Sequence, residues 1–279
     1  MSKKPEPSPV RVRLATHAGS WYSHDEHELE GELSGWLDAA EDQDTQQKQP
    51  NIRAIIGPHA GFRYSGPTAA FAYHHLLDLD RIKRVFILGP SHHFYLRGCA
   101  VSTAHEYETP LGNIVIDHEV NEKLVDSVMG GRKFTAVPIL VGNTKSAMDA
   151  EYGRILAPYL ENDENLFVIS SDFCHWGPRF RYQPHDSTYG EIHEYINYLD
   201  HQGMGFIERL DADGFTRYLD ETNNTICGRH PISLLLHSIL ASNKLKCTLK
   251  FVKYAQSSAC MRHGDSSVSY ASAIIYSNP

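Results

Sequence analysis

Short apolar runs alternate with stretches in which hydrophobic residues recur at helical spacing along most of this chain. Because the apolar runs are hydrophobic at nearly every position, they indicate strands buried on both faces. A sheet of such strands needs helices on both sides. The pattern therefore predicts an α/β fold, a layered α/β/α domain around a mainly buried mixed sheet. The predicted strands are 53–56, 84–88, 136–141 and 166–170, followed by 248–252 and 268–271.

Four helices follow from the same pattern. Ser23 to Glu26 has the form of a capping box, and apolar residues at helical spacing follow from Leu29 to Ala40. Two covering helices are predicted over 68–77 and 191–199. Pro231 is predicted to lie in the first turn of a fourth helix that runs through Ile239.

The remaining segments indicate how the chain is organised. Residues 1–10 are charged and rich in proline, which predicts a flexible tail, and 11–279 are predicted to form a single domain. The polar stretch from Glu41 to Pro50 is predicted to be a surface loop. His24, His27, His74 and His75 are expected to be exposed to solvent.

Composition narrows the classes of function. With 34 acidic and 26 basic residues, the net charge of −8 gives no reason to expect nucleic acid as a partner. No apolar run is long enough for an integral membrane segment. Five cysteines without a CxxC motif favour a reducing compartment, so a cytoplasmic location is expected, with the nucleus as an alternative.

Candidate chemistry gathers where three predicted strands end. His59 follows the first strand, His92 follows the second, and Asp172 and His175 follow the strand over 166–170. In open α/β sheets, ligands bind outside the carboxyl ends of the strands. These imidazoles and the carboxylate are therefore expected to meet at one edge of the sheet.

Cys227 is expected to join them. It lies just before the helix that contains Pro231, and Arg229 follows it closely. Both a helix N-terminus and an arginine favour thiolate over thiol, which predicts a lowered pKa for Cys227. Two imidazoles and one thiolate, from His59, His92 and Cys227, form a predicted metal site suited to copper, iron or zinc.

Several side chains keep alternative roles. Asp172 could bind the metal directly or orient a histidine, and His175 could act as a general base or hydrogen-bond to Asp172. Trp21 and Tyr64 could line a recognition pocket, although aromatic residues more often belong to a core. Arg179 and Arg181 could contact a phosphopeptide. A structural role is expected for His93, Cys174 and His230.

Around these candidate residues and elsewhere along the chain, the sequence resembles the Memo family. The resemblance rests on segments 17–22, 57–62, 87–93, 168–177, 224–231 and 254–258, and it runs in order from Leu14 to Ile275. It implies the LigB-like fold of class III extradiol dioxygenases, in which two histidines and a glutamate hold iron and a further histidine is the base. His59 and His92 match the two metal histidines, His175 matches the base, and Cys227 replaces the carboxylate.

The resemblance also implies a function. Family members are linked to copper or iron, redox activity and reactive oxygen species, and to cytoskeletal and cell-motility signalling. We therefore expect a metal-binding redox and signalling protein, although whether it is an enzyme stays open. The alternative is a non-catalytic adaptor that binds phosphotyrosine-bearing receptors or small GTPases. Dioxygenase activity is the weakest expectation, because a thiolate changes the properties of the metal.

One segment departs from the family pattern. Family members carry a Glu-His-Ser-x-Glu motif before the strand over 136–141, and here residues 125–135 run almost directly into that strand. The chain is therefore interpreted as a shortened form, a splice form or a paralogue, with a more open or a less stable site.

Overall fold

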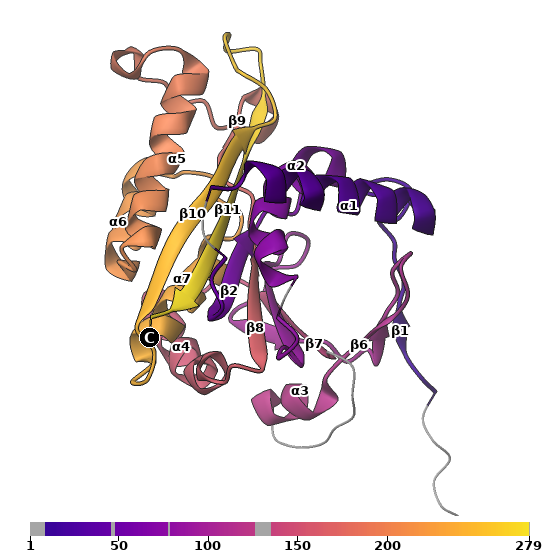
Figure 1. The fold of residues 1–279 in the computed structure, drawn as a ribbon. Coiled ribbons are helices and arrows are strands. Elements are labelled where there is room, and N and C mark those ends of the chain that lie inside the picture. Colours follow the sequence, from indigo (N-terminus) through magenta and orange to yellow (C-terminus); the bar gives the residue numbers. More distant parts are fainter. Residues whose placement is uncertain (1–8, 46–47, 78, 126–134, 279) are drawn as a thin grey trace, which may run out of the picture.

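A mixed sheet forms the centre of the molecule (Figure 1). The computed structural model describes residues 9–45, 48–77, 79–125 and 135–278. Within these ranges, eight strands form the sheet in the order β10-β11-β2-β8-β3-β7-β4, and β9 pairs with β11. Their bounds are β2 Ile52–Gly57, β3 Arg84–Pro90, β4 Cys99–Val101, β7 Thr135–Val141, β8 Asn165–Ser170, β9 His175–Trp176, β10 Cys247–Gln256 and β11 Ser267–Ser277.

The four central strands are parallel. β8 lies between β2 and β3, and β7 continues the sheet beyond β3. β4, β10 and β11 pair antiparallel with their neighbours, so the predicted mixed sheet is confirmed. Because β2, β8 and β3 run in one direction, their carboxyl ends lie at the same edge of the sheet.

Helices cover both faces of this sheet (Figure 1). α2 contacts β2, β10 and β11 and supports α1, whereas α4 and α7 pack together against the β3 and β8 region from the other side. α5 contacts β10, and α6 contacts α5 and α7. The helices are α1 Glu26–Gln43, α2 Phe62–Tyr73, α3 His118–Val125, α4 Ser146–Glu161, α5 Ile192–Glu208, α6 Ala212–Thr222 and α7 Arg229–Ala241.

Successive side chains of β2 point to opposite faces of the sheet, which explains why the strands appear in the sequence as continuous apolar runs. Ala54 and Ile56 are fully buried on the side of α4, α5 and α7. Ile55 is equally buried, but in the separate cluster that includes Ala72 of α2. Since both faces are covered, every position favours an apolar side chain. The predicted α/β/α layering is confirmed.

Smaller elements complete the description. β1 (Val12–Arg13), β5 (Glu106–Tyr107) and β6 (Ile114–Val115) form a separate three-stranded sheet. Short 3-10 helices span His74–Leu76 (η1), Pro178–Phe180 (η2) and Ser187–Tyr189 (η3). The sequence pattern did not predict α3, α4 or α6.

Helix boundaries correct several predictions. α1 begins at Glu26, and its N-cap is Asp25, which accepts a hydrogen bond from the Glu28 amide, rather than Ser23. The helix predicted over 68–77 begins earlier, at Phe62, and ends at Tyr73 as α2. Pro67 lies inside this helix rather than before it. The predicted helix over 191–199 continues to Glu208 as α5. The placement of Pro231 in the first turn of α7 is confirmed.

The predicted surface loop from Glu41 to Pro50 is partly wrong. α1 continues to Gln43, and the side chain of Asp44 is only 4% exposed. His74 and His75 are also buried, at 2% exposure each, which overturns their predicted exposure to solvent. His24 and His27 are exposed as predicted. Most of the predicted tail, residues 1–8, and most of the shortened segment, 126–134, lie outside the described residues.

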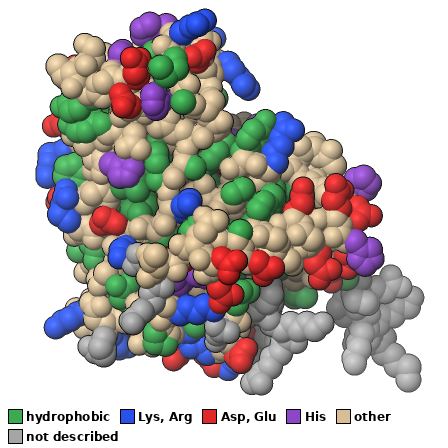
Figure 2. Space-filling model, turned by 45° about the horizontal axis from the view of Figure 1, so that its top comes forward, with side chains coloured by type: hydrophobic (Ala, Val, Ile, Leu, Met, Phe, Trp, Pro, Cys, Tyr) green, Lys and Arg blue, Asp and Glu red, His purple; other side chains and the backbone are tan. Residues whose placement is uncertain are grey.

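Charged side chains are unevenly distributed on the surface. On the face drawn in Figure 2, most of the acidic side chains gather at the lower centre and right, while basic and histidine side chains are scattered. In the described ranges, no helix has both the length and the apolar character needed to cross a bilayer. All five cysteines are free thiols.

Candidate metal centre

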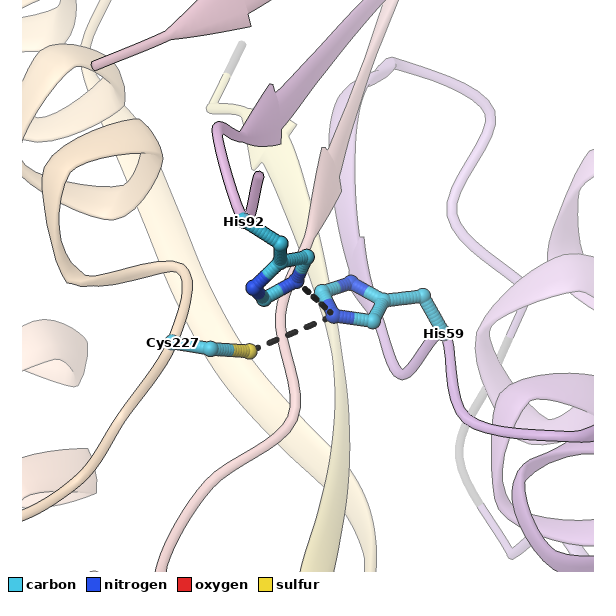
Figure 3. Close-up of side chains that lie close together, drawn as sticks. All are labelled: His59, His92 and Cys227. Atoms are coloured by element: carbon cyan, nitrogen blue, oxygen red, sulfur yellow. Dashed lines mark hydrogen bonds between the residues drawn. The ribbon is translucent and has the colours of Figure 1, made fainter. Parts of the chain in front are cut away.

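Three metal-ligating side chains meet at the carboxyl edge of the parallel strands. His59 follows β2, His92 follows β3, and Cys227 comes from the loop before α7 (Figure 3). Nε2 of His59 lies 3.3 Å from Nε2 of His92 and 3.3 Å from Sγ of Cys227. All three ligand atoms lie within 4.8 Å of one another. The structure thus brings together the predicted ligands from three distant parts of the chain.

These separations fit a single ion. Nitrogen and sulfur ligands bind a tetrahedral ion at about 2.0 to 2.3 Å, which places neighbouring ligand atoms roughly 3.3 to 3.7 Å apart. The two 3.3 Å distances lie in that range. Copper, iron and zinc match this donor set, whereas magnesium and calcium prefer oxygen.

The protonation states of the two histidines also favour binding. Burial lowers the pKa of His59, although Asp172 opposes the change. Burial likewise lowers the pKa of His92, and His59 adds to the effect. Both rings are therefore neutral at neutral pH, and each retains a lone pair for a metal.

Ser170 completes the surroundings of His59. Its Oγ lies 2.7 Å from Nδ1 of His59 and can accept the proton of that nitrogen. This tautomer leaves Nε2, the atom that faces His92 and Cys227, without a proton. Such an outer hydrogen bond orients a metal-binding histidine and raises its basicity.

The predicted pKa of Cys227 is wrong in direction. Burial raises the pKa of this thiol to about 12, and the nearby carboxylate of Asp172 adds to the rise. Backbone hydrogen bonds, including one from the Asp172 amide at 3.2 Å, stabilise the thiolate too weakly to offset burial. Arg229 is exposed, so its charge is screened by solvent. The metal-free site therefore holds a thiol.

Asp172 connects the ligand loops through backbone amides. Its Oδ1 accepts hydrogen bonds from the amides of His59 at 2.8 Å and Ala60 at 3.3 Å, and its side chain is only 5% exposed. Its Oδ2 lies 4.0 Å from Nε2 of His59. Of the two predicted roles, this geometry favours orientation of the His59 loop.

His175 lies beside the same site. Its Nδ1 is within hydrogen-bonding distance of the carbonyls of Phe173, at 2.9 Å, and Thr225, at 3.1 Å. Because a carbonyl can only accept, Nδ1 carries the proton, and Nε2 is left as an acceptor in the neutral ring. Asp172, His175 and Cys227 offer ligand atoms that lie within 4.8 Å of one another. His175 can thus serve as a base next to the site, and its alternative hydrogen bond to Asp172 is not formed.

The loop that carries Cys227 packs directly on the end of β8. A Cβ placed on Gly228 would lie 2.3 Å from Cβ of Ser171, so only glycine fits here. The Gly228 amide donates to Oγ of Ser171 at 3.0 Å, and Oγ of Thr225 accepts from the His175 amide at 2.7 Å. The sequence pattern did not single out Ser170, Ser171 and Thr225 as supporting residues. Their only signal is their position beside Asp172 and Cys227.

The other predicted pocket residues lie elsewhere. Trp21 and Tyr64, each 47% exposed, line a separate cavity of about 500 Å³ together with Arg63. Arg179 lies over the ring of Phe180, which in turn contacts the ring of His175 edge-on. Arg181 is exposed and has a left-handed backbone conformation with φ of 54°. Cys174 is buried, and His230 contacts Thr144 and Asn143 through its ring nitrogens.

Comparison with known proteins identifies relatives over nearly the whole chain. A Caenorhabditis elegans protein, "Protein memo-1 homolog", is 41% identical over 298 aligned residues, covering 96% of this chain and 83% of its own length. The human "Protein MEMO1" is 42% identical, covering 94% of this chain and 96% of its own length. The zebrafish protein of the same name is 44% identical, with coverage of 93% and 95%.

A solved structure and a family model complete the comparison. The structure of an uncharacterized Escherichia coli K12 protein, JW3007, aligns with a TM-score of 0.47 at 14% identity, covering 78% of this chain and 98% of that protein. The model of Memo-like proteins matches residues 13–130 and 128–274, two parts that together span most of the chain. On this match and on the identities above, the chain belongs to the Memo-like protein family.

Proposed function

We propose that this chain is a metal-binding redox and signalling protein that holds copper or iron through His59, His92 and Cys227. The observation that carries the proposal is the convergence of Nε2, Nε2 and Sγ within 4.8 Å, with two separations of 3.3 Å. A thiolate with two imidazoles suits copper and iron, and either metal supplies one-electron exchange with oxygen or superoxide.

The protein's own residues define the surroundings for that chemistry. His92 is exposed, so the site is open to solvent and small molecules on that side. His175 is placed to take up a proton at Nε2, because its Nδ1 is committed to backbone carbonyls. The thiol proton of Cys227 must leave before sulfur can bind a metal, and a ring nitrogen of His175 lies within 4.8 Å of that sulfur.

At the level of the cell, the proposal extends to the processes linked to the family. It comprises reactive-oxygen-linked signalling to the cytoskeleton and to cell motility, in the cytoplasm, with the nucleus as a second location. The name MEMO1, which the human and zebrafish relatives share, describes no activity.

Elemental analysis of protein purified without added metal tests the ligand assignment. We expect His59→Ala, His92→Ala and Cys227→Ser each to lower the metal content at least about 10-fold, because every ligand removed leaves an incomplete site. Matched controls are His93→Ala, next to His92 and exposed, and Cys247→Ser, a half-buried thiol on β10. Electron paramagnetic resonance then separates copper from iron. Unchanged metal content in all three ligand variants would refute the assignment.

A second candidate function is a non-catalytic adaptor. The observation in its favour is the cavity of about 500 Å³ lined by the exposed Trp21 and Tyr64 beside Arg63, a combination that suits a phosphotyrosine peptide. A small GTPase is the other proposed partner. The adaptor predicts that His59→Ala and Cys227→Ser keep peptide binding and cellular function, whereas Tyr64→Ala loses both.

Extradiol dioxygenase activity is the third and weakest candidate. It predicts oxygen uptake with catechol-like compounds. Since Cys227 stands where those enzymes have a carboxylate, we expect no such uptake by the iron-loaded protein.

A further inference from the structure

A second group of metal-ligating side chains lies at the far end of α2 from His59. It consists of Asp44, His74 and His75, whose ligand atoms lie within 4.8 Å of one another. α2 begins just after His59 and ends at Tyr73, and its twelve residues span about 18 Å. This group is therefore separate from the centre formed by His59, His92 and Cys227.

The two imidazoles converge on one carboxylate oxygen. Nε2 of His74 and Nε2 of His75 each lie 2.8 Å from Oδ2 of Asp44. The three side chains are only 3%, 0% and 4% exposed, in the order His74, His75, Asp44. A carboxylate buried this deeply requires a compensating positive charge or strong hydrogen bonds.

The fold provides a negative environment at this point. Asp44 is the C-cap of α1, and His74 is the C-cap of α2. The C-terminal end of a helix carries partial negative charge, so two helix ends and one carboxylate together favour a cation. Lys48 opposes this effect near His75, but its Nζ pairs with Glu41 at 2.8 Å.

Neutral imidazoles are the form that binds a metal, and the burial of His75 favours that form. Burial lowers the pKa of His75, with a further contribution from His74. Metal binding needs the lone pair of each Nε2, so the ring proton moves to Nδ1. Nδ1 of both rings is buried without a hydrogen-bond partner. The shifted protons find no acceptor there, and the affinity should be lower than that of a site with a complete outer shell.

We infer that Asp44, His74 and His75 form a second metal site, for a divalent transition-metal ion of the zinc type, that joins the C-terminal ends of α1 and α2. Two histidines and one carboxylate are a zinc donor set, with the fourth position left to water. Ligand atoms of a tetrahedral site lie about 3.3 Å apart, so the present 2.8 Å contacts must open by about 0.5 Å. The apolar contact between the two helices lies beside this group and is formed by Ala40, Ala70 and Phe71, with Trp36 and Leu37 packed against them.

Zinc titration of the full chain tests this site in a His59→Ala/Cys227→Ser background, which removes the first centre. After dialysis against a chelator, we expect this protein to bind one Zn²⁺ in equilibrium dialysis and to show a higher Tm with zinc. Adding Asp44→Asn or His75→Gln should weaken zinc binding at least about 10-fold and abolish the rise in Tm. His27→Gln, an exposed histidine on α1, is the matched control and should change neither quantity.

Two results would overturn the inference. One is a folded double variant that binds no zinc. The other is zinc binding that survives both Asp44→Asn and His75→Gln. If the added substitutions prevent folding, the X-ray absorption spectrum of the zinc-loaded double variant decides instead, with two imidazoles and oxygen ligands expected and any other first shell overturning the site. The His59→Ala/Cys227→Ser double variant lacks the first centre, so each of these results is independent of the copper or iron proposal.

Discussion

Sγ of Cys227 lies 3.3 Å from Nε2 of His59, although 168 residues separate the two in the chain. The contact depends on the close packing of the Cys227 loop against the end of β8, next to β2. Gly228 permits this packing, since its backbone lies against Ser171 and Ser170. The position of one sulfur ligand thus depends on a neighbour that has no side chain.

Gly228→Ala should displace Cys227. The new Cβ would lie 2.3 Å from Cβ of Ser171 and 2.7 Å from the carbonyl of Ser170, so the loop must move. We expect a loss of about 1 to 3 kcal/mol in the free energy of unfolding and a clear fall in metal affinity. Urea denaturation and metal titration measure the two effects. Gly31→Ala, in α1 with nothing within 4 Å of the added carbon, is the control and should raise stability by up to about 1 kcal/mol. Normal metal affinity in Gly228→Ala would show that the close approach is not needed.

Asp172 should act on the metal site through the His59 loop. Asp172→Ala removes the acceptor for the His59 and Ala60 amides and leaves two donors unpaired. We expect metal affinity to fall about 10- to 100-fold, together with a loss of about 1 to 3 kcal/mol of stability. Asp172→Asn keeps one oxygen for these amides and should retain most of the affinity. If the Asn variant loses as much affinity as the Ala variant, Asp172 acts by its charge or as a ligand.

Asp200 should anchor two loops from behind the site, the one after β8 that contains Cys174 and the one before α7 that contains Asn224. Its buried Oδ1 accepts hydrogen bonds from the Cys174 amide at 3.2 Å and from Nδ2 of Asn224 at 3.0 Å, and its Oδ2 accepts from Tyr254 OH at 2.9 Å. Asp200→Ala leaves these donors buried and should cost about 3 kcal/mol or more.

The isosteric variant separates hydrogen bonding from charge. Asp200→Asn can still accept at Oδ1, and the hydroxyl of Tyr254 can rotate to donate to Oγ of Ser269 at 3.1 Å instead. Burial raises the pKa of Asp200 in the folded protein, so its contribution to stability declines as pH rises through that pKa. The free energy of unfolding of the Asn variant should therefore come closest to that of the wild type at neutral pH. Denaturation at pH 5 and pH 7 measures this difference, and equal losses in Ala and Asn variants would contradict the anchoring role.

Asp117 should contribute stability with the opposite dependence on pH. Burial alone would raise its pKa, but hydrogen bonds from Thr135 Oγ1, the Val120 amide and Arg84 Nε outweigh burial and lower it. A lowered pKa means that the stabilisation is present above the unfolded value of about 3.9 and is lost as pH falls through the folded value.

Comparison of Asp117→Asn with the wild type tests this dependence. We expect the variant to be less stable by about 1 to 3 kcal/mol at pH 7, because it loses a charged acceptor of three hydrogen bonds. The difference should shrink towards pH 3. Asp163→Asn, at a surface turn, is the control and should change little at either pH. A difference that stays constant with pH would exclude ionisation of Asp117 as the source.

The sequence by itself determined the layered α/β fold and the identity of the candidate ligands. Strands buried on both faces need apolar residues at nearly every position, and such runs are visible without coordinates. β2 and β3 show how far this extends, because His59 and His92 directly follow their carboxyl ends. Parallel strands bring those ends to one edge of the sheet whatever the details of packing.

Only the tertiary structure decided the protonation of Cys227 and the surroundings of Asp44, His74 and His75. A local pattern shows that Cys227 precedes a helix, but not how deeply the sulfur is buried, and burial outweighs the helix terminus there. Likewise, two adjacent histidines and a distant aspartate in a polar stretch appear exposed until α1 and α2 meet. Desolvation depends on every atom that packs around a group, and these atoms come from segments far apart in the chain.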